Sequence, residues 1–280
     1  MQYVSFIEGN TPLVLDSPHS GVQYPPDFGH VCDLATLRHA EDTHVEKLYS
    51  FAPALGCAWV EAHFPRSYLD ANRNTTEIDP DMLDGPWPHA VDLADPMVLS
   101  KRKLGKGLIW RVTDDGKLLY NRMLSVDEAQ KRITQCWQPY HAAVEQAISA
   151  AHARHGYSIH INCHSMPAIA ASHATEFPGL VHADFVLGNR DNSTCSANLL
   201  LYIQELLAQV GYTVALNNPY KGVELVRRYS KLAQHRHSVQ IEINRKLYMN
   251  EKTLELHAGF SQLQAHLQAM VQALLTYDPR

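Results

Sequence analysis

Short apolar runs alternate with amphipathic stretches along this chain. The runs that predict strands are Leu13–Asp16, Cys57–Glu61, Ser158–Asn162, Ala183–Leu187, Thr213–Leu216 and Ser238–Ile243. Apolar residues recur at helical spacing over Leu34–Phe51, from Ser125 to His155, over Thr194–Val210 and over Glu251–Tyr277. This alternation indicates an α/β domain with a largely parallel sheet between helices.

The pattern fails between Asn74 and about Leu119. Prolines and glycines interrupt this stretch, at Pro80, Gly85, Pro86, Pro88, Pro96, Gly105 and Gly107. A loop of this length in a compact domain is usually functional or disordered, so we interpret residues 74–119 as a wall or lid of a pocket. With no internal repeat, we expect a single domain spanning residues 1–280.

The composition narrows the range of partners. A hydrophobic fraction of 45% and a charged fraction of 19% are typical of a soluble globular protein. The net charge of −5 argues against a nucleic-acid or anionic-membrane partner. The sequence has neither a signal-peptide pattern nor a long apolar span, and its five cysteines form no CxxC motif. We therefore expect a cytoplasmic protein with free thiols.

Polar clusters follow or close several of the predicted strands. They are Ser17–Gly21, Leu69–Arg73, Asn162–Ser165 and Ile241–Arg245. Ligands of open α/β sheets gather at the carboxyl ends of the strands, so we expect these clusters to converge. Two histidines, an arginine and a glutamate in one cleft predict metal-assisted hydrolysis of an anionic substrate.

His19 and His164 are the first candidates for metal ligands, although His19 also suits a general base or a turn histidine bonded to the backbone. A catalytic zinc usually takes three protein ligands and leaves a fourth position for water. Either Asp42 or His44 is the candidate third ligand. Asp42 is preferred because one carboxylate with two neutral imidazoles leaves a net charge of +1, which still acidifies bound water.

Other polar residues suit substrate binding and proton transfer. The planar fork of Arg73, with Asn72 beside it and Asp70 behind, suits a substrate carboxylate, and Arg227 adds positive charge. Glu242 lies between two β-branched residues, which places it either on a solvent-facing edge strand or in a cleft as a general base. A nucleophile at Ser165 or Cys163 is a minor alternative, since no G-x-S-x-G motif accompanies them.

Taken together, the motifs resemble the N-formylglutamate amidohydrolase family over nearly the whole chain. The matching segments are Ser17–Gly21, Asp42–Val45, Arg66–Arg73, Gly107–Ile109, Asp115–Gly116, Pro139–His141, Asn162–Ser165, Pro219–Gly222, Gln240–Arg245 and Tyr248–Met249. Each motif alone is weak, but their order and number carry the resemblance.

The resemblance implies a mixed sheet between helices, as in zinc carboxypeptidases and acylases, and the hydrolysis of N-formyl-L-glutamate to formate and L-glutamate late in histidine breakdown. The implied substrate is a small anionic N-acyl amino acid, and one Zn²⁺ per chain is expected. The implied residues are His19, Asp42 and His164 for the metal, Asn72 and Arg73 for a carboxylate, and Glu242 for catalysis.

One departure concerns Asn162, which stands where an acidic residue often precedes the Cys/His pair, so support for the metal is expected to be weaker there. Two alternatives remain open. One is a zinc hydrolase acting on another N-acyl amino acid or small peptide, and the other is a non-catalytic relative that binds a small acidic ligand.

Overall fold

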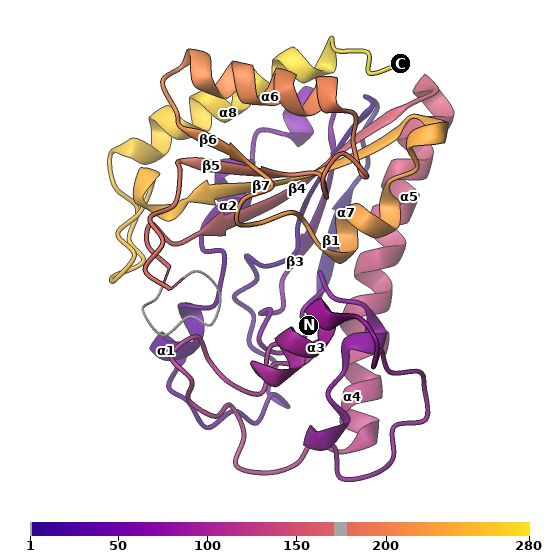
Figure 1. The fold of residues 1–280 in the computed structure, drawn as a ribbon, viewed down its shortest axis with the longest axis vertical. Helices are drawn as coiled ribbons and strands as arrows, with labels where there is room; N and C mark the ends of the chain where they lie inside the picture. Colours follow the sequence, from indigo (N-terminus) through magenta and orange to yellow (C-terminus); the bar gives the residue numbers. More distant parts are fainter. Residues whose placement is uncertain (1, 171–177) are drawn as a thin grey trace. The chain divides into compact units, whose positions relative to one another are not determined.

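The computed structural model describes residues 2–170 and 178–280 (Figure 1). By contacts, the chain divides into two compact units that interleave along the sequence. The first unit comprises Met1–Ser5, Pro18–Thr43 and Glu61–Ala142, and the second comprises Phe6–Ser17, His44–Val60 and Ala143–Arg280. The single domain over residues 1–280 therefore stays a prediction.

A seven-stranded sheet has the order β1-β3-β2-β4-β7-β5-β6 (Figure 1). Strands β2, β4 and β7 pair in parallel, β5 pairs antiparallel with β7, and β6 is parallel to β5. The mixed, largely parallel α/β sheet is therefore confirmed. The strands are β1 (Val4–Ile7), β2 (Leu13–Ser17), β3 (Ala58–Ala62), β4 (Ser158–Met166), β5 (Phe185–Gly188), β6 (Val214–Leu216) and β7 (Arg236–Asn244). Strand β1 was not among the strands predicted from the sequence.

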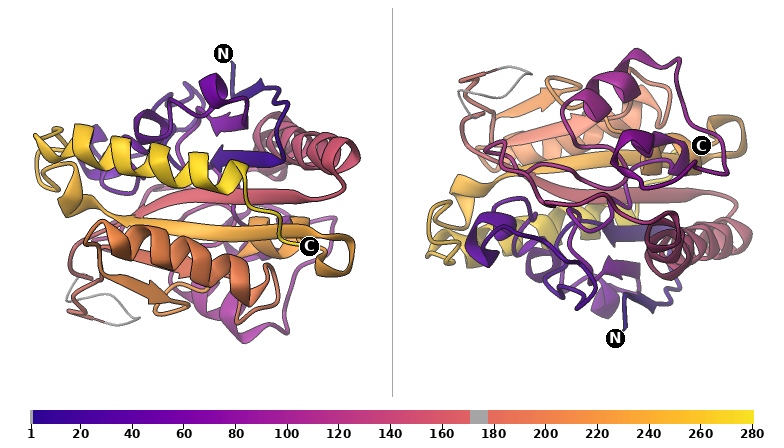
Figure 2. Two further views of the ribbon diagram at one scale, coloured as in Figure 1. Left: turned by 90° about the horizontal axis from the view of Figure 1, so that it is seen from above. Right: turned by 90° about the horizontal axis from the view of Figure 1, so that it is seen from below.

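The central strands β4 and β7 present an apolar face and a polar face, because successive side chains of a strand point to opposite sides. The apolar face packs into the main core, which also takes residues from α2 (Val45–Leu48), α6 (Ala197–Gln209) and α8 (Gly259–Leu275). Helices α6 and α8 lie side by side over the sheet (Figures 1 and 2). The apolar residues of the two strands are Ile159, Ile161, Cys163, Val239, Ile241 and Ile243.

The polar face of the same strands is also buried. His160, Asn162 and His164 of β4 pair in register with Ser238, Gln240 and Glu242 of β7. Tyr229 of α7 (Glu224–Tyr229) contacts the ring of His160, so this helix packs on the polar side. Strands of parallel sheets are normally buried on both faces, and here hydrogen-bonding side chains fill one of them.

Two strands are longer than the sequence predicts. Strand β4 continues to Met166 instead of ending at Asn162, and β7 continues to Asn244. Polar residues do not end these strands because their side chains find partners on the polar face. His164 consequently lies within a strand rather than in a loop beyond it, and Glu242 lies within β7 as predicted.

The predicted helix over Leu34–Phe51 is wrong. The first unit contains α1 (Leu34–Arg38), and the second contains the single turn α2. His44 has φ 68°, a left-handed conformation that a continuous helix excludes. Further back, the backbone N–H of Asp42 donates to the carbonyl of His19 at 3.0 Å instead of to a helical carbonyl.

The predicted helix from Ser125 is confirmed, together with its capping box to Glu128. It comprises α4 (Val126–Arg132), a π-helical turn (Ile133–Trp137) and α5 (Gln138–His155). The last helix begins later than predicted, at Gly259.

The stretch 74–119 is not structureless. It contains α3 (Pro96–Lys103) and the 3₁₀ turns Thr75–Glu77 and Pro80–Met82. Asn74 begins the first of these turns with its own capping box. Within residues 2–170 and 178–280, no helix is both long and apolar enough to cross a membrane.

Candidate metal centre

In the first unit, His19 lies between two buried aspartates. Its Nε2 is 2.6 Å from Oδ1 of Asp70, and its Nδ1 is 3.4 Å from Oδ2 of Asp42. All three side chains are at most 2% exposed. The backbone hydrogen bond from Asp42 to His19 keeps the two segments in this position. The first unit thus brings together two of the three predicted metal ligands.

The spacing of these two side chains fits a metal ion. Ligand atoms about 2.0–2.1 Å from a tetrahedral zinc lie roughly 3.3 Å apart. The distance between His19 Nδ1 and Asp42 Oδ2 is close to that value. With Nε2 of His19 donating to Asp70, Nδ1 carries the lone pair that a metal needs.

Arg66 joins the two aspartates. Its guanidinium lies 3.1 Å from Oδ2 of Asp70 and 3.6 Å from Oδ1 of Asp42, and it stacks over the Trp110 ring. Burial alone would raise the pKa of Asp70, but its electrostatic interaction and hydrogen bond with His19 and the positive charge of Arg66 hold that pKa well below its usual range. Asp70 was predicted to lie behind Arg73. It instead supports His19.

In the second unit, His164 belongs to a buried chain of hydrogen bonds. Its Nε2 donates to Oδ1 of Asn162 at 2.7 Å. Nδ2 of Asn162 donates to Oδ1 of Asp16 at 2.9 Å, and Nε2 of His160 approaches the same oxygen at 3.0 Å. The amide oxygen of Asn162 thus accepts a hydrogen bond from His164 at the position where an acidic residue was expected. Weaker support for a metal at this position stays a prediction.

Glu242 lies directly beside His164 in the parallel pair of β4 and β7. Its carboxylate is 7% exposed and accepts a hydrogen bond from Nε2 of Gln240 at 2.8 Å. Glu242 is therefore on a central strand, not on a solvent-facing edge. The second unit brings together one predicted metal ligand and the predicted catalytic carboxylate.

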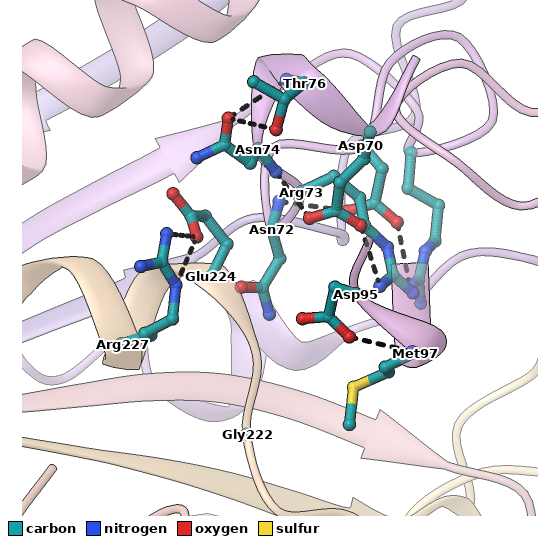
Figure 3. A network of polar contacts seen from close by, with 12 residues as sticks. Asp70, Asn72, Arg73, Asn74, Thr76, Asp95, Met97, Gly222, Glu224 and Arg227 are labelled. Atoms are coloured by element: carbon teal, nitrogen blue, oxygen red, sulfur yellow. Dashed lines mark hydrogen bonds and ion pairs between the residues drawn. The ribbon is translucent and has the colours of Figure 1, made fainter. Parts of the chain in front are cut away.

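Asn72 and Arg73 follow Asp70 in a buried turn of the first unit (Figure 3). The backbone N–H of Asn72 donates to Asp70, and Arg73 forms a 3.4 Å ion pair with Glu77. Nε of Arg73 is buried and has no hydrogen-bond partner within the described residues. A buried guanidinium with an unused donor suits a carboxylate ligand.

Two other candidate site residues already form hydrogen bonds with neighbouring residues. Arg227, on α7 of the second unit, donates through Nε to Glu224 at 2.9 Å, and its side chain is 52% exposed (Figure 3). His44 is 2.8 Å from the carbonyl of Leu254 and 3.0 Å from Nζ of Lys47. These contacts use both ring nitrogens of His44, which leaves Asp42 as the better candidate for the third ligand.

Sequence reasoning did not assign roles to Arg66, Asp16, His160 and Gln240. Arg66 is four residues before Asp70, and the structure alone reveals that it also reaches Asp42. His160 and Gln240 are polar residues at alternate positions of β4 and β7, whereas Asp16 follows three apolar residues in β2. That alternation was a usable signal, because a polar residue in a doubly buried strand needs a polar partner.

Comparison with known proteins matches the chain to one protein family and to two related enzymes. The model of the family described as N-formylglutamate amidohydrolase matches residues 11–249. N-formylglutamate deformylase of Pseudomonas aeruginosa is 28% identical over 257 residues, covering 90% of this chain and 87% of that protein. The deformylase of Pseudomonas putida is 28% identical over 282 residues, covering 98% and 96%.

Solved structures agree with these matches. The crystal structure of N-formylglutamate amidohydrolase from Ralstonia eutropha JMP134 is 42% identical in sequence and has a TM-score of 0.92. The match covers 99% of this chain and 98% of that chain. Gene product Atu2144 from Agrobacterium tumefaciens has a TM-score of 0.66 at 17% identity, with 98% of this chain and 96% of that chain covered. At that identity, the likeness concerns the fold alone.

The arginine that joins the two aspartates is open to a direct test. We expect Arg66→Met to lower the free energy of unfolding of the metal-free protein by about 2–3 kcal/mol at pH 7, because two buried carboxylates lose a shared cation. Urea unfolding measures the loss. Lys131→Met is the control, since its ion pair with Asp27 is 50% and 37% exposed and is worth at most about 1 kcal/mol. Equal losses in both variants would show that Arg66 does not stabilise the aspartates.

Proposed function

The chain belongs to the N-formylglutamate amidohydrolase family, and from this premise we propose that it hydrolyses the formamide bond of N-formyl-L-glutamate to formate and L-glutamate. The names of its relatives support the substrate. The observation that carries the proposal is the His19–Asp42 pair, whose buried ligand atoms have the spacing expected around a metal ion.

We propose that His19, Asp42 and His164 hold one zinc ion. All three side chains are buried and are of the nitrogen and carboxylate types that zinc accepts, which supports this ligand set. Two neutral imidazoles and one carboxylate leave the site with a net charge of +1. When bound, zinc would supply a Lewis acid that polarises the formyl carbonyl and acidifies water.

Glu242 is proposed as the general base and then the general acid. Its carboxylate accepts the proton of the attacking water and returns a proton to the amine nitrogen that leaves as L-glutamate. The hydrogen bond from Gln240 fixes the position of the Glu242 carboxylate. Low exposure keeps bulk water from competing for this carboxylate.

Arg73 and Asn72 are proposed to bind a substrate carboxylate. The buried Nε of Arg73 is a donor that a carboxylate would satisfy, and the amide of Asn72 adds a second polar group beside it. Arg227 is proposed as a more peripheral source of positive charge, because its guanidinium already binds Glu224. These residues position the substrate and do not take part in proton transfer.

We also propose that the reaction belongs to histidine breakdown and takes place in the cytoplasm. A role in histidine breakdown follows from the proposed substrate. The five cysteines are free thiols, which supports a reducing cytoplasm.

The first test measures metal content and formate release together. We expect about one zinc per chain, formate release from N-formyl-L-glutamate, loss of activity on chelation and recovery with zinc. Stoichiometric zinc with hydrolysis of a different N-acyl amino acid would replace the proposed substrate. A chain that neither binds zinc nor releases formate after reconstitution would favour a non-catalytic relative.

Glu242→Gln tests the proton-transfer role. The amide cannot accept the proton, so we expect kcat to fall by about 10²–10⁴-fold while the zinc content stays unchanged. Glu205→Gln, an exposed substitution on α6, is the control and should keep the activity of the unaltered chain. A Glu242→Gln protein with near-normal turnover would rule out Glu242 as the base.

Arg73→Lys tests the carboxylate clamp. An ammonium cannot reproduce a two-pronged hydrogen bond, so we expect KM to rise by about 10–100-fold with a much smaller change in kcat. The control is Arg111→Lys, which alters an exposed arginine paired with Asp79. A selective loss of kcat with unchanged KM would contradict a role in substrate positioning.

A further inference from the structure

We infer that Asp16 and Asn162 are positioning residues that select Nδ1 of His164 as its metal-binding atom. The inference rests on the proposed function, because it concerns a ligand of the proposed zinc site. All the residues that carry it belong to the second unit and are at most 3% exposed. Neither Asp16 nor Asn162 is a metal ligand or a catalytic residue in the proposed reaction.

The first step is the position of the Asp16 carboxyl group beside Asn162. Its Oδ1 is 2.9 Å from Nδ2 of Asn162 and 3.0 Å from Nε2 of His160. This oxygen accepts the hydrogen bond from the amide of Asn162. Nδ1 of His160 lies 3.2 Å from the hydroxyl of Ser238, so both nitrogens of that ring have polar neighbours.

The second step is the orientation of the Asn162 amide. Nδ2 of Asn162 donates to Oδ1 of Asp16, so the NH₂ group of Asn162 faces Asp16. The amide oxygen then points the other way, where it lies 2.7 Å from Nε2 of His164. A reversed amide would place its oxygen against the carboxylate of Asp16. The acceptor oxygen of Asp16 therefore decides which end of Asn162 faces the histidine.

The third step is the tautomer of His164. The oxygen of Asn162 has no proton to give, so Nε2 of His164 must carry one. In the neutral imidazole the lone pair is then on Nδ1, which is the atom able to bind a metal. In the first unit, Asp70 imposes the same tautomer on His19 through Nε2. Both histidines would thus ligate through Nδ1.

The experiment observes the tautomer directly. Imidazole ¹⁵N–¹H correlation spectra are recorded on the metal-free chain with ¹⁵N-labelled histidine, and a His164→Gln spectrum identifies the His164 signals. We expect a neutral ring with the proton on Nε2. A proton on Nδ1 in the unaltered protein would overturn the inference whatever the variants do.

Variants at position 162 separate orientation from packing. Asn162→Leu has a similar size but removes the acceptor, so we expect the Nε2–H signal to lose its dominance and zinc affinity to fall by about 10–100-fold. Asn162→Asp keeps an acceptor for His164 and should retain the tautomer, at a cost in stability from a second carboxyl group beside Asp16. Ser158→Ala, on the same face of β4, is the control and should change neither quantity.

Zinc affinity is measured by competition with a chromophoric chelator, so no readout depends on turnover. A folded Asn162→Leu protein that keeps both the tautomer and the affinity would overturn the inference, as would an unaltered chain that binds no zinc. The expected spectra and affinities in a protein that releases no formate would uphold the inference and overturn the proposed function.

Discussion

The burial of both faces of β4 and β7 is the constraint on which the rest of the second unit depends. A strand covered on one side only can turn its polar residues to water, but these strands cannot. A polar side chain on the inner polar face is stabilised by a partner in the protein, because an unsatisfied buried group costs about 1–3 kcal/mol. The hydrogen-bonded chain through Asp16, Asn162 and His164 provides such partners and gives His164 a fixed orientation.

Charge balance imposes a comparable requirement on the first unit. Asp42 and Asp70 are buried carboxylates, and a pair of them would not stay ionised without nearby positive charge. Arg66 supplies a permanent cation to both, and His19 lies between them. Asp70 is thereby free to act as an acceptor for His19. Asp42 keeps the negative charge that a divalent cation would neutralise.

The sequence predicted the parts of this structure that depend on local patterns. Strand cores such as Leu13–Asp16 and the capping box at Ser125 follow from side-chain periodicity and local hydrogen bonding, so both were found. The break before His44 was missed because a long-range hydrogen bond from Asp42 to His19 overrides helical periodicity there. The extension of β4 was missed because polar residues normally mark strand ends, and their partners come from other strands.

The same reasoning explains why candidate residues were easier to predict than their supporting contacts. His19 and His164 are conspicuous as residue types, whereas the function of Asn162 depends on Asp16, which is 146 positions away. An acid at position 162 would place a second carboxylate against Asp16 in a region without exposed solvent, at a considerable cost in free energy. An amide avoids that cost and, unlike a carboxylate, has a donor end and an acceptor end. The orientation of the Asn162 amide, rather than the charge of a carboxylate, therefore holds His164 in position.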